Sequence, residues 1–301
     1  MVHRVAWQAV DAAALLLAPG REDHKYSRGV LGLRTGSASY PGAAVLGAEA
    51  AWRTGVGLVR YFSPTDDVAS DSGLPSPAAA VLAVRPETVF SGDRGEDRAR
   101  CDAWLIGSGT DPAARSFGEH EALLALLAGS APVVVDAGAL GLVAAQRPTA
   151  PVIVTPHQGE FSTLWASSGL DPAGAEERPP EHRASILAAH LGVTVLLKGA
   201  RSLIAAPSGE VFGHGPATPW LATAGTGDVL AGILGALVAT HSNRVRDDGL
   251  LLAKLGATAA MLHDDAARLA SGDHKASGSG GPITALDVAQ ALPSAVAALR
   301  G

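Results

Sequence analysis

The hydrophobic positions of this chain fall into short, continuous runs of Val, Ile and Leu. Such runs are typical of strands that are buried on both faces of a sheet. They predict strands at residues 29–33, 57–62, 103–106, 132–135, 152–154 and 193–197. Ala- and Leu-rich segments between them predict helices, for example at residues 42–53, 118–127 and 181–191. This alternation predicts an α/β fold in three layers, with a mostly parallel central sheet and helices on both faces.

Two segments depart from this alternation. Residues 202–206 and 210–212 flank the turn Pro207-Ser208-Gly209, which predicts an antiparallel hairpin at the edge of the sheet. At the N-terminus, the apolar residues 12–17 are too few for a signal peptide, and we expect an amphipathic helix that ends at Gly20. Segments rich in Pro, Gly and Ser predict loops at residues 63–76, 167–180 and 271–282, the last of them mobile.

The composition is that of an ordered globular protein, with 301 residues of which 47% are hydrophobic and 17% charged. No linker or repeat marks a boundary, so we expect one domain over residues 1–301. A net charge of −6 favours no nucleic-acid partner. The most apolar stretch, residues 229–239, is too short to span a membrane, and we expect a cytoplasmic protein. Cys101 is the only cysteine and is expected to be a small buried residue.

Polar and turn-forming residues gather directly after the predicted strands. Ligands of open parallel sheets bind beyond the carboxyl ends of the strands. Each of these segments could be an ordinary turn, but together, on one predicted edge, they indicate one extended site. In chain order they are Thr35-Gly36-Ser37, Gly107-Ser108-Gly109, Asp136-Ala137-Gly138, residues 155–160 and Lys198-Gly199.

The segment Ala224-Gly225-Thr226-Gly227-Asp228 precedes a helix whose apolar stripe begins at Val229. We expect the helix to begin near Gly227, with free backbone N–H groups that form an anion hole for a phosphoryl group. Asp228 in the first turn could act on a bound hydroxyl as a base or orienting group. Alternatively, Asp228 complements the helix dipole and the glycines only turn the chain.

Three further residues are candidates for the site. Lys198 directly follows an apolar strand, and a phosphate would satisfy its charge. His157 could cap a helix or line the pocket, with its tautomer open. Glu160 is a candidate metal ligand, or it complements the dipole of the following helix. The chain contains no complete G-x-G-x-x-G fingerprint, phosphate-binding P-loop or structural-metal spacing. His241 and His263 are expected at the surface or at helix ends.

Taken in order, these motifs resemble those of the ADP-dependent NAD(P)H-hydrate dehydratases, a ribokinase-like family. The resemblance spans nearly the whole chain and is specific as a set, because simple sugar kinases share strongly only the Gly-Thr-Gly-Asp turn. It rests on His24-Lys25, Gly29, Gly36-Ser37, residues 40–46, 53–59, 106–109, 135–140, 154–161, 197–200 and 224–232, and more loosely on His263, residues 283–287 and Leu292-Pro293.

The resemblance implies a ribokinase-like fold and a repair reaction. The family restores NADH or NADPH from the hydrated nucleotides (6S)-NADHX and (6S)-NADPHX. ADP supplies its terminal phosphoryl group and leaves as AMP, with Mg²⁺ assisting. The resemblance also implies a homotetramer. The fused N-terminal epimerase domain of many members has no counterpart in the short segment before His24, so we expect a separate epimerase to act with this protein.

The resemblance also implies roles for the residues of this sequence that match the family's motifs. The residues expected to bind the hydrated nucleotide are Ala43, Gly109, His157 and Asp228. Those expected to bind the adenine nucleotide are Lys198, Gly199, Ala200, Arg201, Ser202, Thr226 and Gly227. As a hypothesis, Asp228 activates the ring hydroxyl while the N–H groups of residues 225–227 stabilise the transferring phosphoryl group, so that Gly225 and Gly227 join Asp228 in the catalytic set.

The sequence departs from the family pattern close to the expected nucleotide, at Thr35, Ser108, Thr110, Ala224 and His214. Two alternatives therefore stay open. An ATP-dependent ribokinase-like kinase acting on a hydroxymethylpyrimidine, a thiazole or a sugar alcohol would share the anion hole and Asp228. A non-catalytic nucleotide sensor would keep the fold without turnover. The preference between NADHX and NADPHX is not fixed by the sequence.

Overall fold

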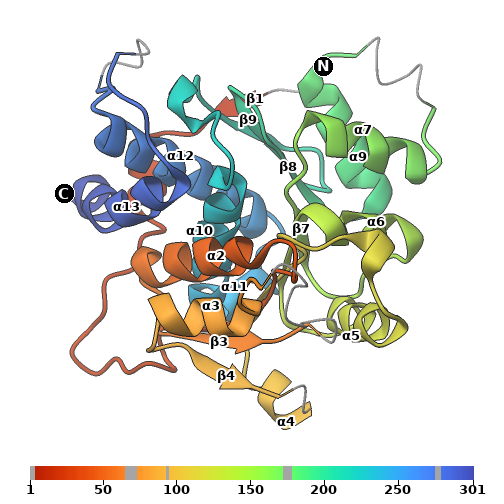
Figure 1. Ribbon diagram of the computed structural model, residues 1–301. Helices are drawn as coiled ribbons and strands as arrows, with labels where there is room; N and C mark the ends of the chain where they lie inside the picture. The colour runs from red at the N-terminus through yellow and green to blue at the C-terminus, as the bar shows by residue number, and fades with distance from the viewer. Residues whose placement is uncertain (1–3, 65–72, 93–94, 172–177, 275–278) are drawn as a thin grey trace.

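A ten-stranded sheet forms the middle layer of the computed structural model, which describes residues 4–64, 73–92, 95–171, 178–274 and 279–301 (Figure 1). Its strand order is β1-β10-β9-β8-β7-β6-β5-β2-β3-β4. Among the described pairings, β9 alone runs antiparallel to its neighbours. The strands are β1 (Arg4–Ala6), β2 (Val30–Arg34), β3 (Leu58–Phe62), β4 (Val89–Ser91), β5 (Ala103–Ile106), β6 (Val133–Val135), β7 (Val152–Val154), β8 (Thr194–Leu197), β9 (Ser202–Ala205) and β10 (Val211–His214).

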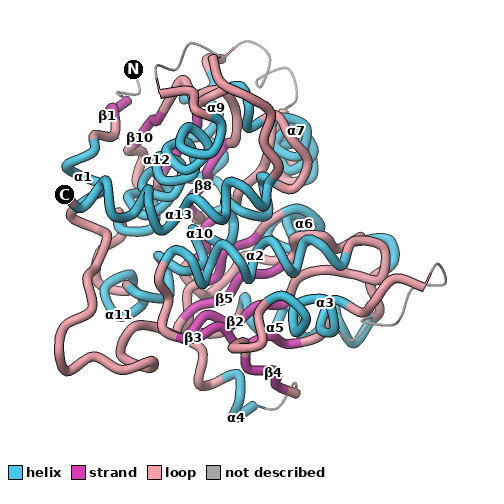
Figure 2. Tube along the Cα trace, turned by 60° about the vertical axis from the view of Figure 1, so that its left-hand side comes forward, coloured by secondary structure: helices cyan, strands magenta, loops and turns pink. Residues whose placement is uncertain are grey.

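Helices cover both faces of the sheet, and each face has its own apolar core. Figure 2 shows α2, α10 and α13 in front of the strands. The helices of this face are α1 (Ala9–Ala13), α2 (Pro41–Thr54), α3 (Pro77–Val84), α10 (Thr226–Thr240), α11 (Ser242–Val245), α12 (Leu251–Ser271) and α13 (Ala285–Arg300). The opposite face carries α5 (Phe117–Leu127), α6 (Leu140–Ala145), α7 (Gln158–Ser167) and α9 (Pro180–Leu191). Shorter helices are α4 (Gly95–Arg98) and the 3₁₀ helices η1 (Pro112–Ala114), η2 (Ala137–Ala139) and η3 (Pro219–Leu221).

The predicted α/β fold is confirmed. All six predicted strands are present, each within one residue of its expected ends, and so are the three helices at residues 42–53, 118–127 and 181–191. The hairpin of β9 and β10 is also present and antiparallel. Cys101 is 7% exposed, as expected. No helix within the described ranges is both long enough and apolar enough to cross a membrane.

Three predictions about the ends of the sheet and chain were wrong. The hairpin is not the edge, because β1 pairs in parallel with β10 and lies outside it. Neither β1 nor β4, at the opposite edge, was predicted, because these strands are mostly exposed and lack the continuous apolar run that identified the equally short β6 and β7. The N-terminal helix ends at Ala13 instead of Gly20, and Pro19 disfavours helix in the residue before it.

The predicted loops at residues 63–76, 167–180 and 271–282 include residues 65–72, 172–177 and 275–278, which lie outside the described residues. The predicted mobility of the third loop therefore concerns in part residues that the structure does not describe.

Candidate active site

Five consecutive neighbours in the sheet end at the same edge and place the predicted polar turns side by side. In sheet order these strands are β8, β7, β6, β5 and β2, which are mutually parallel. Lys198, Thr155, Asp136, Gly107 and Thr35 are the first residues after them. The prediction that the turns share one edge is confirmed by this topology, and the groups described below all come from it or from the start of α10.

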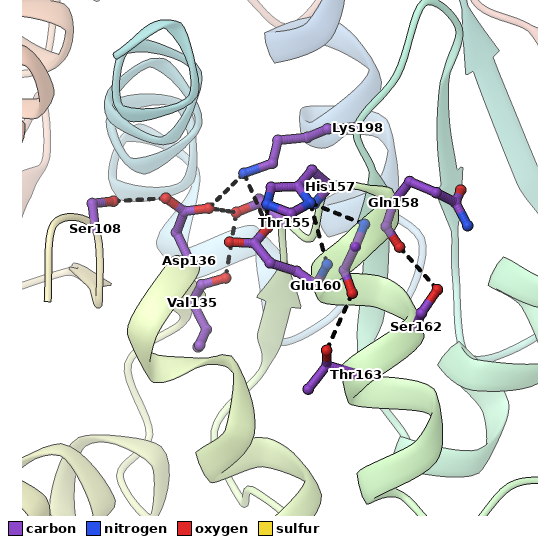
Figure 3. A network of polar contacts seen from close by, with 11 residues as sticks. Ser108, Val135, Asp136, Thr155, His157, Gln158, Glu160, Ser162, Thr163 and Lys198 are labelled. Atoms are coloured by element: carbon purple, nitrogen blue, oxygen red, sulfur yellow. Dashed lines mark hydrogen bonds and ion pairs between the residues drawn. The ribbon is translucent and has the colours of Figure 1, made fainter. Parts of the chain in front are cut away.

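Asp136 is the centre of a network of hydrogen bonds at this edge (Figure 3). Its side chain is buried, with the residue 2% exposed. The Oδ1 atom accepts from Thr155 Oγ1 at 2.7 Å and from Lys198 Nζ at 2.9 Å. The Oδ2 atom accepts from Ser108 Oγ at 2.9 Å. The residues that follow three other strands are thereby tied to one carboxylate, which fixes its position.

Lys198 carries a stable positive charge into the site. Burial by itself would lower the pKa of this ammonium group, but the charge of Asp136 and then that of Glu160 outweigh burial and raise the pKa. Glu160 Oε2 lies 3.8 Å from Lys198 Nζ. A Cβ atom added to Gly227 would lie 3.6 Å from the same nitrogen, so the ammonium group stands over the start of α10.

The N-terminus of α10 has the form of an anion hole. Gly225 is its N-cap, with φ of 86°, and a side chain there would meet Leu46 Cδ1 at 2.6 Å. Thr226 N donates to Thr223 O at 3.4 Å, and the first intrahelical bond is that of Val229 N to Gly225 O. Within the described chain, no acceptor pairs with the N–H groups of Gly227 and Asp228. Of the three N–H groups expected to be free, only that of Thr226 has an acceptor; those of Gly225 and Gly227 have none among the described residues, and that of Asp228 joins them.

Asp228 has the electrostatic surroundings of a base that works near neutral pH. Burial, followed by the charge of Asp136, raises the pKa of its carboxyl group to about 6, against the attraction of Lys198. Such a group is largely ionised at pH 7 but still binds a proton readily. These surroundings favour the first of the two interpretations of Asp228, that of a base or orienting group.

His157 and Glu160 form a reciprocal cap at the start of α7. His157 Nδ1 accepts from the N–H groups of Gly159 at 3.0 Å and Glu160 at 3.2 Å. Glu160 Oε2 accepts from His157 N at 2.7 Å. Because Nδ1 is an acceptor, the neutral ring carries its proton on Nε2, which settles the open tautomer. His157 both caps the helix and lines the cavity, as its two predictions allowed. Glu160 lies in the first turn of α7, as the dipole interpretation predicted, and also approaches Lys198; its role as a metal ligand stays a prediction.

A cavity of about 580 Å³ opens between the turn after β8 and the start of α10. Six of the seven residues predicted to bind the adenine nucleotide line it, namely Lys198, Gly199, Ala200, Ser202, Thr226 and Gly227. Arg201 departs from this prediction. Its side chain turns to the neighbouring cavity of about 380 Å³ and donates to Gly215 O at 2.8 Å. Ala200 and Ser202, on either side of Arg201 in the sequence, line the cavity of about 580 Å³, whereas the Arg201 side chain points to the other cavity.

Two other residues predicted to bind the hydrated nucleotide, Ala43 and Gly109, do not line the cavity of about 580 Å³. Ala43 and Gly109 touch, because a Cβ atom on Gly109 would stand 2.3 Å from Ala43 Cβ. Gly109 has φ of 66° and can hardly be replaced. Beside this pair lies a cavity of about 350 Å³ lined by Gly36, Ser37, Tyr40 and Thr110, among others. His157, in contrast, lines the cavity of about 580 Å³. Asp228 lies close to α2, with its carbonyl oxygen 3.9 Å from a Cβ atom added to Gly47.

The prediction that His241 and His263 lie at the surface or at helix ends is confirmed for His241 and wrong for His263. They are 2% and 7% exposed, because α10 and α12 are covered by other helices. His241 does stand at a helix end. His263 lies inside α12 and lines the cavity of about 580 Å³, and burial lowers its pKa to about 4. Ala259 and Ala260, four and three positions before His263 and therefore on its side of the helix, are the apolar signal that should have identified His263 as internal.

The departures from the family pattern have structural roles in part. Ser108 donates to Asp136, and Thr110 Oγ1 donates to Gly107 O at 2.8 Å. His214 Nε2 pairs with Asp264 Oδ2 at 3.1 Å. Thr35 Oγ1 is buried and has no partner among the described residues. Nothing in the structure explains Ala224. Asp136 itself was noticed only as a turn residue, and its pairing with Lys198 was missed.

The described residues hold no cluster of three or more His, Cys, Asp or Glu side chains that could bind a metal ion. Mg²⁺ does not need one, since it commonly takes one or two protein carboxylates together with substrate phosphates and water. Glu160 offers such a carboxylate 3.8 Å from the ammonium group of Lys198, which lines the cavity of about 580 Å³. The donor set is therefore compatible with Mg²⁺ that arrives with a nucleotide.

The sheet order, the helix layers and the anion hole at the start of α10 define a ribokinase-like protein. The solved structures include a crystal structure of an ADP/ATP-dependent NAD(P)H-hydrate dehydratase from Bacillus subtilis, co-crystallised with ATP/Mg²⁺. It is 26% identical to this chain, with a TM-score of 0.77, and the match covers 99% of this chain and 100% of that one.

The family follows from the sequence comparisons. The profile of the NAD(P)H-hydrate dehydratase family matches residues 31–288, and the chain belongs to this family. The bifunctional NAD(P)H-hydrate repair enzyme Nnr of Mycobacterium tuberculosis is 40% identical over 78% of this chain, although the match covers only 46% of that enzyme. The ADP-dependent (S)-NAD(P)H-hydrate dehydratase of Xanthomonas campestris is 35% identical over 77% of this chain and 80% of its own length. The chain spans about half the length of its bifunctional relatives.

Proposed function

We propose that this chain catalyses the ADP-dependent dehydration of (6S)-NADHX and (6S)-NADPHX to NADH and NADPH, with release of AMP and phosphate. The observation that carries the proposal is the position of Asp228. Its carboxyl group, with a pKa of about 6, stands at the anion hole of α10 and within the field of Lys198. Family membership and the name of the Xanthomonas relative support the choice of substrate and phosphoryl donor.

In the first step, Asp228 accepts the proton of the hydroxyl group on the hydrated ring as its oxygen attacks the β-phosphorus of ADP. A new P–O bond forms, the bond to the bridging oxygen breaks, and AMP leaves with the bonding electrons. The N–H groups of Gly227 and Asp228 and the ammonium group of Lys198 face the charge that the phosphoryl oxygens carry. Asp136 holds Lys198 in place. Mg²⁺ bound with ADP, and held by Glu160, would neutralise charge on the phosphates.

In the second step, the ring carbon loses its phosphate, which is a far better leaving group than hydroxide. The lone pair of the ring nitrogen assists the departure, and the adjacent ring carbon gives up a proton to the leaving phosphate. The ring double bond forms and the dihydropyridine is restored. This order explains why the site needs an anion hole and a base for a net dehydration.

The nucleotide and the hydrate have separate places in this arrangement. We assign the cavity of about 580 Å³ to ADP, with Lys198, Gly199, Ala200, Ser202, Thr226 and Gly227 around it. Arg201 would contact the nucleotide only from the neighbouring cavity. Ala43, Gly109 and His157 would bind the hydrated nucleotide on either side of Asp228. We further propose one domain over residues 1–301, a cytoplasmic homotetramer, and a separate epimerase that supplies the S epimer.

The proposal is tested by identifying the phosphorus-containing products. The protein is incubated with (6S)-NADHX, ADP and Mg²⁺, and the products are resolved by ³¹P NMR. We expect AMP and orthophosphate to accumulate in equal amounts with NADH, and neither to form without the hydrate. A stable phosphate ester of an alcohol, formed from ATP and a small alcohol but not from the hydrate, would instead establish the kinase alternative.

A further inference from the structure

One wall of the nucleotide cavity is formed by His214, the last residue of β10, and the segment that follows it. Residues 214–222 supply six of the cavity's lining side chains, those of His214, Ala217, Thr218, Pro219, Leu221 and Ala222. Apart from the short helix η3, residues 215–222 have no regular hydrogen-bonding pattern of their own. The shape of this segment therefore depends on contacts with the rest of the fold.

Asp264 of α12 makes the central contacts to this wall. It is 2% exposed and lies behind the wall, on the side away from the nucleotide cavity. Its Oδ1 accepts from Thr218 N at 2.7 Å, and its Oδ2 pairs with His214 Nε2 at 3.1 Å. The burial of Asp264 would raise its pKa, but the hydrogen bonds from His214, Thr218 and Arg268 outweigh it and lower the pKa. The carboxylate is therefore ionised and holds the wall at both ends of residues 214–218.

Two neighbours extend these contacts. Arg268 donates to Asp264 Oδ2 at 3.0 Å through Nε and to Pro216 O at 2.9 Å. Asp273 is fully buried and accepts from Thr218 Oγ1 at 2.8 Å. These bonds join charged groups, so they are stronger than those between neutral partners. The mechanism proposed above uses none of these three side chains.

We propose that Asp264 is a positioning residue for nucleotide binding, which fixes residues 214–218 as the wall of the adenine-nucleotide cavity. The inference rests on the proposed function only in taking an adenine nucleotide as the occupant of that cavity. Asp264 does not touch the reacting atoms. Its loss affects the fraction of molecules whose wall is in the binding arrangement, and the apparent dissociation constant rises by the reciprocal of that fraction.

The variants are Asp264→Ala, which removes both acceptors, and Asp264→Asn, which keeps an acceptor for Thr218 N. Asp248→Asn is the matched control. Asp248 also accepts from a backbone N–H, that of Leu250 at 2.9 Å, and pairs with Lys254 at 3.2 Å, but it lies before the opposite end of α12. Calorimetry with ADP and Mg²⁺ gives the affinity without any turnover. Steady-state kinetics separates KM for ADP from kcat, and the melting temperature reports folding.

If the wall is formed in about a tenth of Asp264→Ala molecules, the Kd and KM for ADP rise about tenfold. We expect kcat at saturating ADP and KM for the hydrate to stay near the wild-type values. Asp264→Asn should show a smaller rise, and Asp248→Asn none. The proposal is overturned if Asp264→Ala, with a cooperative melting transition, binds ADP as the wild type does. It is equally overturned if Asp264→Asn and Asp264→Ala change kcat, KM for ADP and KM for the hydrate together, in proportion to a lower melting temperature.

The proposed function is judged separately by the wild-type protein. A wild type that binds no adenine nucleotide contradicts both proposals. A wild type that binds ADP but does not dehydrate the hydrate contradicts the proposed function alone, since the calorimetric comparison of the Asp264 variants still decides the role of the wall.

Discussion

At the scale of single residues, the account depends on Asp228 and its two charged neighbours. Asp136 and burial keep the pKa of Asp228 near 6, while Lys198 keeps it from rising further. Asp136 in turn is fixed by Thr155, Ser108 and Lys198. A carboxylate that is ionised at pH 7, next to free N–H groups at a helix start, can take a proton from a hydroxyl while the phosphoryl group is held.

Replacement of Asp228 by Asn tests this role. The amide cannot accept the hydroxyl proton, so we expect kcat to fall by about 10³-fold. Because the N–H groups of α10 and Lys198 remain, the affinity for ADP should change little. Steady-state rates and calorimetry with ADP measure the two effects. Turnover within tenfold of the wild type would remove Asp228 from the mechanism.

The pH profile follows from the same residue. With the pKa of Asp228 raised to about 6, the active, ionised form is lost as the pH falls through 6. We expect kcat/KM for the hydrate to fall about tenfold per pH unit below that value and to be level between pH 7 and 8. An ordinary carboxyl group would place the fall near pH 4. A profile that stays level down to pH 5 would contradict the raised pKa.

At the scale of elements, α10 joins the core to the chemistry. Its N-terminus forms the anion hole, and its body packs closely against α2, where a Cβ atom on Gly232 would lie 2.4 Å from Gly47 O. A side chain at this position must push apart the two helices. The position of the anion hole and the packing of the core are therefore set by the same contact.

Gly232→Ala tests this close packing. The clash is with backbone, which cannot rotate away, and we expect a loss of about 1–3 kcal/mol in the free energy of unfolding. Gly141→Ala in α6 is the control, since nothing lies within 4 Å of its added Cβ, and it should be neutral or stabilising by up to about 1 kcal/mol. Urea denaturation measures both. Equal stabilities of the two variants would show that α2 and α10 can separate without cost.

The secondary-structure elements also show which parts of the fold could be predicted from the sequence. The buried strands were predictable because each is a continuous apolar run, and the start of α10 because Gly225 precedes a clear apolar stripe. β1 and β4 are short, partly exposed edge strands without such a signal. The pairing of Asp136 with Lys198, 62 positions apart, depends on which strands are neighbours, which local pattern does not specify. The direction of the Arg201 side chain likewise depends on the conformation of the turn after β8.

At the scale of the whole molecule, the parallel strands bring two ligand spaces to one edge. The cavity of about 580 Å³ lies by β8 and α10, and that of about 350 Å³ lies by the turns after β2 and β5. Ala43 and Gly109 adjoin the second, and Asp228 lies close to α2 and within the field of Lys198, which lines the first. A donor on one side and an acceptor on the other fit a transfer between two nucleotides. This arrangement could not be inferred from motifs alone, because the motifs give positions after strands but not distances between them.

The most direct test of the central claim is the rise in absorbance at the NADH band when the protein acts on (6S)-NADHX and Mg²⁺, with ADP and ATP added in separate reactions. The account predicts a rise that depends on ADP and is lost in Asp228→Asn. A rise with ATP alone would keep the dehydration but change the phosphoryl donor. The absence of a rise with either nucleotide, in a protein that binds ADP by calorimetry, would contradict the proposed function.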